Sequence, residues 1–457
     1  MKRVLFFFVL GVTLCGLWAC HQTKIPFFKP VKPVYEKLSN GFEIFFAEDH
    51  ELPLVQLQIF IRGGSVYDPK GKEGLTEVAM QLLRLGGSKN YRPHEIENQL
   101  EYVGASLEMG ADEESEVVSL SILKKDLDLG LKLLFDLLQN PTFDSDQFQT
   151  IIRRRREALK REKEDPLTWA NREYSPFVYG AESLWGRRST IETIDRITLE
   201  DVRDFHRRLI QPQLMVMAAA GDLSEEKLSL KIQTELSQWT LGSLKAGETV
   251  LTTIPPLHAD ETPATQVLSQ KGLSQSTIMV GHLTTKRTNP DKFALQVMNF
   301  ILGGSGALTS RLGEEIRSSS GKAYSVWSEY GFGPEAGIFR AVAQTSLENT
   351  EWVLNRMKAQ IEKITTDPKF SRDELDRAKQ ALLRSLIFRY ERRFDQVREL
   401  ARFHIWGYPD NYFEILQKGI QKVGLSDIER VAREYLHPDH LKVLMVTDET
   451  TENRFKK

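Results

Sequence analysis

The sequence predicts an α+β protein in which one half-domain is present twice. The main observation is a repeated stretch: "TLEDVRDFHRRLIQP" begins at Thr198, and "GLSDIERVAREYLHP" begins at Gly424. An apolar run follows each copy and ends in an acidic turn, at Asp222 and at Asp448. Strand-like and helical patterns are mixed in each half rather than strictly alternating, which favours the α+β class.

The composition is that of a globular protein without a nucleic-acid-binding character. The chain has 457 residues, of which 41% are hydrophobic and 27% are charged. Its 61 basic and 63 acidic residues give a formal net charge of -2. Nucleic-acid binders usually concentrate positive charge, so this balance argues against that class of function.

The N-terminus has the features of a secretion signal. Lys2 and Arg3 precede the apolar run "VLFFFVLGVTLCGLWAC", which is shorter than the roughly 20 apolar residues of a membrane span. The run ends in "LWAC", which resembles the lipobox of bacterial lipoproteins. We therefore expect residues 1–19 to be a lipoprotein signal peptide and Cys20 to carry the lipid. An ordinary cleaved signal with an incidental cysteine is the alternative.

The cysteine count and the residue after Cys20 bear on location. Cys15 and Cys20 are the only cysteines, so a chain cleaved before Cys20 has no internal disulfide. By resemblance to the sorting rules of enteric bacteria, His21 in place of an aspartate favours the outer membrane. We expect a lipid-anchored protein of the bacterial cell envelope that faces the periplasm. Residues 20–34 contain several prolines and are expected to form a tether.

One helix of the first half raises a functional question. The stretch "GKEGLTEVAMQLLRLGG", from Gly71 to Gly87, predicts a buried helix that ends at glycines. On its other face Glu77, Met80 and Gln81 stand at i, i+3 and i+4. That spacing is the one with which a helix presents zinc ligands and a general base to one point.

Strand signals and a linker complete the organisation. The runs "EVVSLSIL" and "GIFRAVAQT" alternate in the manner of half-buried strands. Residues 241–264 are rich in glycine, threonine and proline and have no periodicity, which predicts an interdomain linker. We therefore expect one half at 35–240 and the other at 265–450, packed face to face so that they enclose a space.

These features together resemble the pitrilysin or insulinase family of metallopeptidases, particularly two-half bacterial members related to mitochondrial processing peptidase. The resemblance covers residues 34–448, and two of its carriers are "IFIRGGSVYDPKGKEGL" and "LGGSGALTSRLGEEIRSSSGKAYSVWS". It implies two homologous halves, each a mostly antiparallel sheet packed with helices, facing each other around a cavity.

In active members the helix after the glycine turn carries His-x-x-Glu-His, which binds zinc and activates water. Aligned on Gly74, this motif falls on Glu77, Met80 and Gln81, so both histidines and the base are absent. Methionine cannot take a proton, and glutamine coordinates a metal only weakly. The resemblance therefore implies that these are degenerate zinc-motif positions.

Other ligands do not restore a zinc site in the sequence. The family's third ligand is a glutamate on a later helix, where Glu157 and Glu162 are available. No two histidines stand at i, i+4, and His437 and His440 flank a proline at a helix end, where surface positions are expected. We predict no catalytic residue, metal or other cofactor in this chain, with zinc only in a partner subunit.

Two further segments bear on substrate. Family members bind the substrate backbone as an added strand at a sheet edge. Where active members usually carry Asn-Ala there, this chain has Glu108 and Met109, which argues against peptide binding by the first half. Active members also use an Arg and a Tyr seven residues apart that reach across the cavity to the substrate. Arg317 and Tyr324 have this spacing, although a salt bridge and a core position are the alternative.

The sequence thus predicts a chain that is inactive alone but pairs with a zinc-bearing homologue. In that heterodimer Arg317 and Tyr324 contribute to the binding and hydrolysis of an extended peptide. Whether the chain counts as part of an enzyme therefore depends on the partner. The alternatives are a non-enzymatic peptide-binding lipoprotein and a scaffold, like the core subunits of respiratory complexes that resemble this family.

Overall fold

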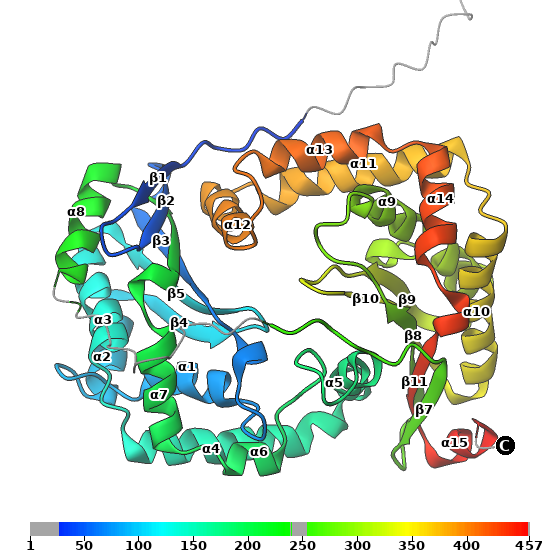
Figure 1. Cartoon of the computed structure of the whole chain (residues 1–457), viewed down its shortest axis with the longest axis horizontal. Helices are drawn as coiled ribbons and strands as arrows, with labels where there is room; N and C mark the ends of the chain where they lie inside the picture. The colour runs from blue at the N-terminus through cyan, green and yellow to red at the C-terminus, as the bar shows by residue number, and fades with distance from the viewer. Residues whose placement is uncertain (1–26, 238, 240–253, 456–457) are drawn as a thin grey trace, which may run out of the picture.

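A computed structural model describes residues 27–237, 239 and 254–455. The predicted signal peptide, Cys20 and most of the predicted linker lie outside these residues. Within the described part, two sheets stand on opposite sides of the molecule, each with its own set of helices (Figure 1). The predicted α+β fold of two similar halves is confirmed.

The first sheet has six mostly antiparallel strands in the order β1-β2-β6-β3-β5-β4. Only the pairing of β2 with β6 is parallel. The first of the strand runs noted in the sequence becomes β5, in which buried and partly exposed residues alternate as predicted. The strands are β1 Val34–Lys37, β2 Glu43–Glu48, β3 Leu54–Arg62, β4 Ser106–Ala111, β5 Ser115–Leu123 and β6 Met215–Gly221.

The second sheet repeats the topology of the first. Its order is β7-β11-β8-β10-β9, with one parallel pairing between β7 and β11. Matching β2, β6, β3, β5 and β4 to β7, β11, β8, β10 and β9 reproduces every neighbour. The strands are β7 Ala264–Ser269, β8 Gln275–Leu283, β9 Ala323–Tyr330, β10 Ile338–Ser346 and β11 Lys442–Thr447.

Helices cover the outer face of each sheet. The repeated stretch forms α7 and α14, and each leads through a short turn into the central strand β6 or β11. Asp201 and Asp427 accept hydrogen bonds from the backbone at the two helix starts, which explains why both copies carry an aspartate there. The helices of the first half are α1 Leu75–Leu85, α2 Pro93–Val103, α3 Leu127–Gln139, α4 Ser145–Arg161, α6 Ile191–Asp195, α7 Leu199–Leu209 and α8 Glu225–Leu236. Those of the second half are α9 Lys292–Leu302, α10 Thr350–Thr366, α11 Arg372–Arg389, α13 Tyr412–Lys422, α14 Leu425–Tyr435 and α15 Glu449–Phe455.

The remaining two long helices are exchanged between the halves. Helix α5, Pro166–Tyr179, belongs to the first half in sequence but packs on β8 and β11 of the second sheet. Helix α12, Arg393–Ile405, belongs to the second half but packs on β6, β2 and β3 of the first sheet. Both helices therefore lie between the two sheets (Figure 1).

Each exchanged helix completes a small apolar core. Val397 and Ala401 of α12 are fully buried against the first sheet, in a cluster that includes Phe60 and Ala218. On the other side, Tyr174 of α5 is fully buried against the second sheet, where its hydroxyl donates to the Lys442 carbonyl at 3.2 Å. Because a helix covers each inner face, the central strands β6 and β11 are buried along their whole length.

The N-terminal part of the described chain crosses between the halves. Residues 27–33 lie within the predicted tether but are packed on the second half. The ring of Phe28 contacts Phe413 at 5.5 Å between centroids, and Gln417 donates to the Phe28 carbonyl at 2.9 Å. The Val31 N–H donates to the Gln396 side chain at 2.7 Å. An apolar ring and two glutamine amides thus fix a stretch that its prolines alone suggested to be free.

None of the helices in the described residues is long and apolar enough to cross a membrane.

The helix exchange predicts that the two halves unfold together. Val397→Ala should lower the free energy of unfolding by about 2 kcal/mol, because it removes two methyl groups from a close-packed site between the halves. The urea unfolding curve should shift as a whole and stay a single transition. Leu230→Ala on α8, where the side chain is mostly exposed, is the control and should change stability by less than about 0.5 kcal/mol. Two separate transitions in the Val397 variant would contradict the mutual dependence of the halves.

Candidate functional site

The start of α1 is fixed by a buried carboxylate. Asp68 accepts hydrogen bonds from the Gly74 and Thr76 N–H groups at 2.7 and 2.9 Å and from the Thr76 hydroxyl at 2.6 Å. Burial raises the pKa of Asp68 to about 6, and these hydrogen bonds oppose the rise. Gly74 has φ of 102°, which glycine tolerates best. The helix therefore begins at a defined point and direction.

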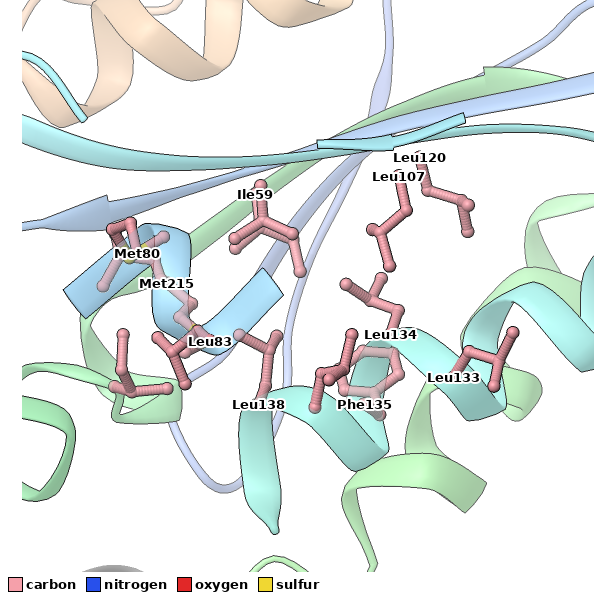
Figure 2. Close-up of a cluster of buried hydrophobic side chains, with 14 of the residues drawn as sticks. Ile59, Met80, Leu83, Leu107, Leu120, Leu133, Leu134, Phe135, Leu138 and Met215 are labelled. Carbon is pink, nitrogen blue, oxygen red and sulfur yellow. The ribbon is translucent and has the colours of Figure 1, made fainter. Parts of the chain in front are cut away.

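At the base position of the motif, Met80 is a core residue. Its side chain is fully buried. Figure 2 shows it close to Ile59 and Met215, from strands β3 and β6, at one end of the hydrophobic cluster. A carboxylate there would be desolvated and unpaired, whereas a thioether adds to the packing. The position where active members activate water contributes here to stability alone.

The first ligand position of the motif pairs with a cation of the same chain, and the second contacts the first. A carboxylate oxygen of Glu77 lies 2.5 Å from Nη2 of Arg155 on α4. The Gln81 amide reaches the other Glu77 oxygen at 3.5 Å. Burial raises the pKa of Glu77, while the positive charge of Arg155 opposes the rise. A guanidinium thus neutralises the carboxylate that a metal ion would otherwise meet.

The other glutamates near this ion pair also have basic partners. Glu162, one of the two candidate third ligands, binds the Arg172 guanidinium with both oxygens, at 2.8 and 3.2 Å. Glu157, the other candidate, is exposed and pairs with Lys160 at 2.7 Å. No group of three or more His, Cys, Asp or Glu side chains that could hold a metal ion occurs among the described residues. The donor set of this corner does not fit zinc, because its carboxylates are already engaged by cations: Glu77 and Glu162 by arginines and Glu157 by a lysine.

Of the three histidines near the second sheet, one is fully buried and two are partly buried. His282 on β8 is fully buried, and its ring lies 5.3 Å from that of His437, whose ring is 5.2 Å from that of His440. Both ring nitrogens of His282 are used, one with the Leu283 carbonyl and one with the His437 N–H. These contacts make the row a packing feature, which the sequence spacing of His437 and His440 did not reveal.

Strand β4 presents an open edge. It is the last strand of its sheet, and the Asp112 N–H donates to the Ser115 carbonyl across the hairpin that follows. Alternation along the strand then points the backbone groups of Leu107, Met109 and Ala111 away from β5. The Leu107 carbonyl accepts from the Arg84 guanidinium. Nothing in the described residues pairs with the backbone groups of Met109 or Ala111.

The side chains at this edge do not decide whether a peptide strand can pair with it. Glu108 is exposed and Met109 is half-buried against the core of the first half. Because an added strand is held by main-chain hydrogen bonds, the edge stays competent for pairing whatever these two side chains are. The sequence-based argument against peptide binding concerned side chains only.

Arg317 and Tyr324 are exposed in the second half. Arg317 lies on a turn of π-helix, Gly313–Ser318, and Tyr324 lies near the start of the edge strand β9 with 74% of its surface exposed. Neither side chain makes a hydrogen bond or ion pair with the residues that the structure describes. The alternative of a salt bridge and a core position therefore does not hold, and both groups are available to a ligand.

The segment that carries this pair is tied to the second half by several side-chain contacts. Arg311 binds both oxygens of Glu374, at 2.9 and 3.2 Å, and its guanidinium stacks on Phe370 at 4.6 Å. The buried Ser310 hydroxyl donates to the Ala307 carbonyl at 2.6 Å. The π-helical turn packs mainly on β9 and α10, which both belong to the second half.

A contact between the halves was missed by sequence reasoning. Glu114, at the tip of the β4–β5 hairpin, forms an ion pair with Arg287 of the second half. The Arg287 guanidinium stacks on Trp406 at 4.7 Å, and the Tyr408 hydroxyl donates to the Arg287 carbonyl at 3.0 Å. These residues line a cavity of about 370 Å³ between the halves. A single arginine in a loop gives no sequence signal for such a contact.

Comparisons with known proteins agree on one family. Residues 44–173 match the model of the insulinase family, peptidase family M16, and residues 196–382 match that of the peptidase M16 inactive domain. The non-peptidase homologue YmxG of Helicobacter pylori is 25% identical and covers 98% of this chain and 99% of its own length. The β subunit of the mitochondrial processing peptidase of Dictyostelium discoideum is 22% identical, with 88% of each chain covered.

Solved structures share the fold. A peptidase M16 inactive domain from Pseudomonas fluorescens superimposes with a TM-score of 0.81 at 23% identity, covering 92% of this chain and 98% of its own. A protease from Helicobacter pylori gives a TM-score of 0.79 at 18% identity, with 91% and 99% covered. At these identities the likeness concerns the fold.

The ion pair at the degenerate motif predicts a measurable coupling. Arg155→Met should destabilise the protein at pH 7 by about 1 kcal/mol, because Glu77 loses its nearest cation. The double variant with Glu77→Gln should recover most of this loss, which gives a coupling energy of about 1 kcal/mol from urea unfolding of the four proteins.

The pH dependence follows from the direction of the pKa. The attraction between Glu77 and Arg155 requires the ionised carboxylate, so the coupling should disappear as pH falls through the raised pKa of Glu77. Because burial raises that pKa, ionisation of Glu77 as a whole lowers the stability of the fold, and Arg155 reduces this loss. The control is the same cycle with Lys160→Met and Glu157→Gln, an exposed ion pair. Its coupling energy should be close to zero. No coupling between Arg155 and Glu77 at pH 7 would contradict the assignment.

Proposed function

The chain belongs to the insulinase family of peptidases, family M16, as an inactive homologue, and from this we propose that it is the non-catalytic subunit of a two-chain peptidase. In this proposal a separate, zinc-bearing homologue supplies the metal site, and this chain supplies Arg317 and Tyr324. A named relative, the mitochondrial processing peptidase β subunit, is itself one subunit of a peptidase, which supports a two-chain assembly.

The observation that carries the proposal is an asymmetry between the halves. In the first half, the motif positions are closed by the Arg155 ion pair and by the burial of Met80. In the second half, Arg317 and Tyr324 are exposed and without a partner among the described residues. Both side chains are therefore accessible to a ligand, on a segment that the Arg311–Glu374 ion pair supports.

The chemistry of the two side chains suits a peptide substrate. A guanidinium donates paired hydrogen bonds to a carbonyl or carboxylate oxygen, so Arg317 would hold the peptide backbone in place. A phenol donates one hydrogen bond and would stabilise the negative charge that develops on a carbonyl oxygen during attack by water. The partner's zinc would supply the activated water, for which this chain has no base.

The proposal includes a place in the cell. The N-terminal sequence supports a lipid anchor at Cys20 and a position in the bacterial envelope, facing the periplasm and most simply at the outer membrane. Cys20 and residues 1–26 lie outside the described residues. Mass spectrometry of the mature N-terminus tests this part independently of the peptidase assay.

Reconstitution tests the pairing. The chain and a zinc-bearing M16 homologue encoded in the same genome should be purified separately and assayed on unfolded peptides alone and mixed. The mixture should cleave at least about tenfold faster than the zinc subunit, and this chain alone should not cleave. A mixture no faster than the zinc subunit would sink the proposal.

Substitutions in the active mixture test the two residues. Tyr324→Phe should lower kcat at least about tenfold, since a donor to a developing oxyanion is worth that much or more. Arg317→Ala should instead raise KM, since it removes the guanidinium that holds the peptide backbone. Tyr102→Phe on α2 and Arg384→Ala on α11 are matched controls at exposed positions and should leave turnover unchanged. If Tyr324→Phe and Tyr102→Phe behave alike, Tyr324 is not part of the reaction.

A second candidate, peptide binding without cleavage, is favoured by the open edge of β4. Ala111→Pro removes an outward N–H without breaking the bonds to β5, so it should abolish peptide binding and leave stability nearly unchanged. Ala111→Val, which keeps the N–H, should still bind. Fluorescence anisotropy of a labelled peptide with the single chain measures this, and equal binding by both variants would place the peptide elsewhere.

A further inference from the structure

The cavity between the halves lies where two equivalent hairpins meet. It has a volume of about 370 Å³, and Glu114 at the tip of the β4–β5 hairpin lines one side of it. Gly331 and Phe332, at the tip of the β9–β10 hairpin, line it as well. Helices α9, α11, α12 and α13 supply most of the remaining wall. Both halves of the repeat thus contribute to one cavity.

Two polar groups of the lining are buried without a hydrogen-bond partner. The Tyr330 hydroxyl and Nε of Arg287 have none among the described residues, although the two residues are only 7% and 8% exposed. A buried donor without a partner is costly and rare in a folded protein, which favours a ligand at this place. Burial also raises the pKa of Tyr330, so its hydroxyl stays protonated and able to donate.

The charged groups of the lining leave one cation over. Glu114 pairs with Arg287, and Glu399 pairs with Arg402. Arg389, at the end of α11, interacts with the phenol of the next residue but forms no ion pair with a described residue. One positive charge and two buried donors therefore suit a ligand with a single carboxylate.

Aromatic rings form much of the remaining surface. Seven of the fifteen lining residues are aromatic, among them Phe332, Phe403 and Tyr408. Leu386 and Leu416 add aliphatic surface. The volume is at the small end of the roughly 300–1,000 Å³ of ligand sites, so the cavity admits one residue-sized group rather than a long stretch of chain. A large apolar group that carries a carboxylate fits this lining.

The position of the cavity favours a peptide as the source of that carboxylate. Glu114 follows Ala111, the last residue of β4, by three residues, or about 10 Å of extended chain. A peptide paired with the open β4 edge, in the same direction as that strand, would therefore bring its C-terminus to the cavity. A C-terminal residue has a carboxylate next to a side chain, which is the combination that the lining fits.

We propose that the cavity binds the C-terminal residue of a peptide whose last side chain is aromatic or branched aliphatic. The side chain lies among the rings, and the carboxylate accepts hydrogen bonds from Arg389, from the Tyr330 hydroxyl and from Nε of Arg287. The proposal deepens the peptide-binding function above and rests on it for the peptide. It adds a pocket that distinguishes free C-termini from internal segments of a chain.

Calorimetric titration of the purified mature chain tests the pocket. The probes are N-acetyl-phenylalanine, its amide, and a short unstructured peptide that ends in phenylalanine with a free or an amidated C-terminus. Each free acid should bind at least about tenfold more tightly than its amide, since a hydrogen bond to a charged group is worth that much or more. Equal binding of acid and amide would overturn the proposal.

Substitutions in the lining test the two donors. Arg389→Gln and Tyr330→Phe should each remove most of the preference for the free acid. Because the Tyr330 hydroxyl has no partner in the fold, its loss should not lower the free energy of unfolding, so the variant stays folded. Arg384→Gln, at an exposed position earlier on α11, is the matched control and should keep the preference. If Arg389→Gln and Arg384→Gln bind alike, the carboxylate is not held in this cavity and the proposal fails.

The edge variant separates this proposal from the function on which it rests. Ala111→Pro should weaken binding of the free-acid peptide but leave N-acetyl-phenylalanine, which is too short to pair with β4, unaffected. A peptide that binds at β4 with no difference between acid and amide overturns the pocket and leaves the peptide edge intact. If N-acetyl-phenylalanine shows the acid preference while the peptide shows none, the cavity is a site for small free acids, which overturns its assignment to peptides.

Discussion

The structure depends on the exchange of two helices between its halves. Each sheet has two apolar faces, and the helices of its own half cover only one of them. Helix α12 covers the second face of the first sheet, and α5 covers the second face of the second sheet. Neither half can bury its central strand without the other, so the pair behaves as one folding unit even though the sequence is a repeat. The same two helices lie between the sheets.

The two halves differ in the side chains that stand at the family's functional positions. The motif helix of the first half keeps its packing but has replaced metal ligands with an ion pair to Arg155 and the base with a core methionine. The Arg155 guanidinium neutralises the carboxylate and occupies the space beside it, so no metal ion is required to balance the charge and none can approach. The second half keeps Arg317 and Tyr324 at the surface, on a segment that Arg311 ties to Glu374 of α11. A first half without zinc ligands and a second half with accessible side chains suit the proposed non-catalytic subunit.

Much of this could be predicted from the sequence, since it depends on local pattern. The repeat of helix and central strand, the alternating strand β5, the glycine stop of α1 and the degenerate motif are all visible in short windows. The helix exchange, the Glu77–Arg155 pair and the Glu114–Arg287 contact were not predictable, because each joins residues distant in sequence through ordinary residue types. The docking of residues 27–33 was hidden for a related reason: prolines signal a linker, and only the receiving surface shows that Phe28 and Val31 are bound.

Native mass spectrometry of the complex with a zinc-bearing homologue tests the central claim most directly, because it counts metal ions and assigns them to subunits. The account predicts one copy of each chain and one zinc ion, which stays with the partner when the complex is dissociated in the gas phase. A zinc ion retained by this chain, or no complex at the concentration at which the partner is active, would contradict it.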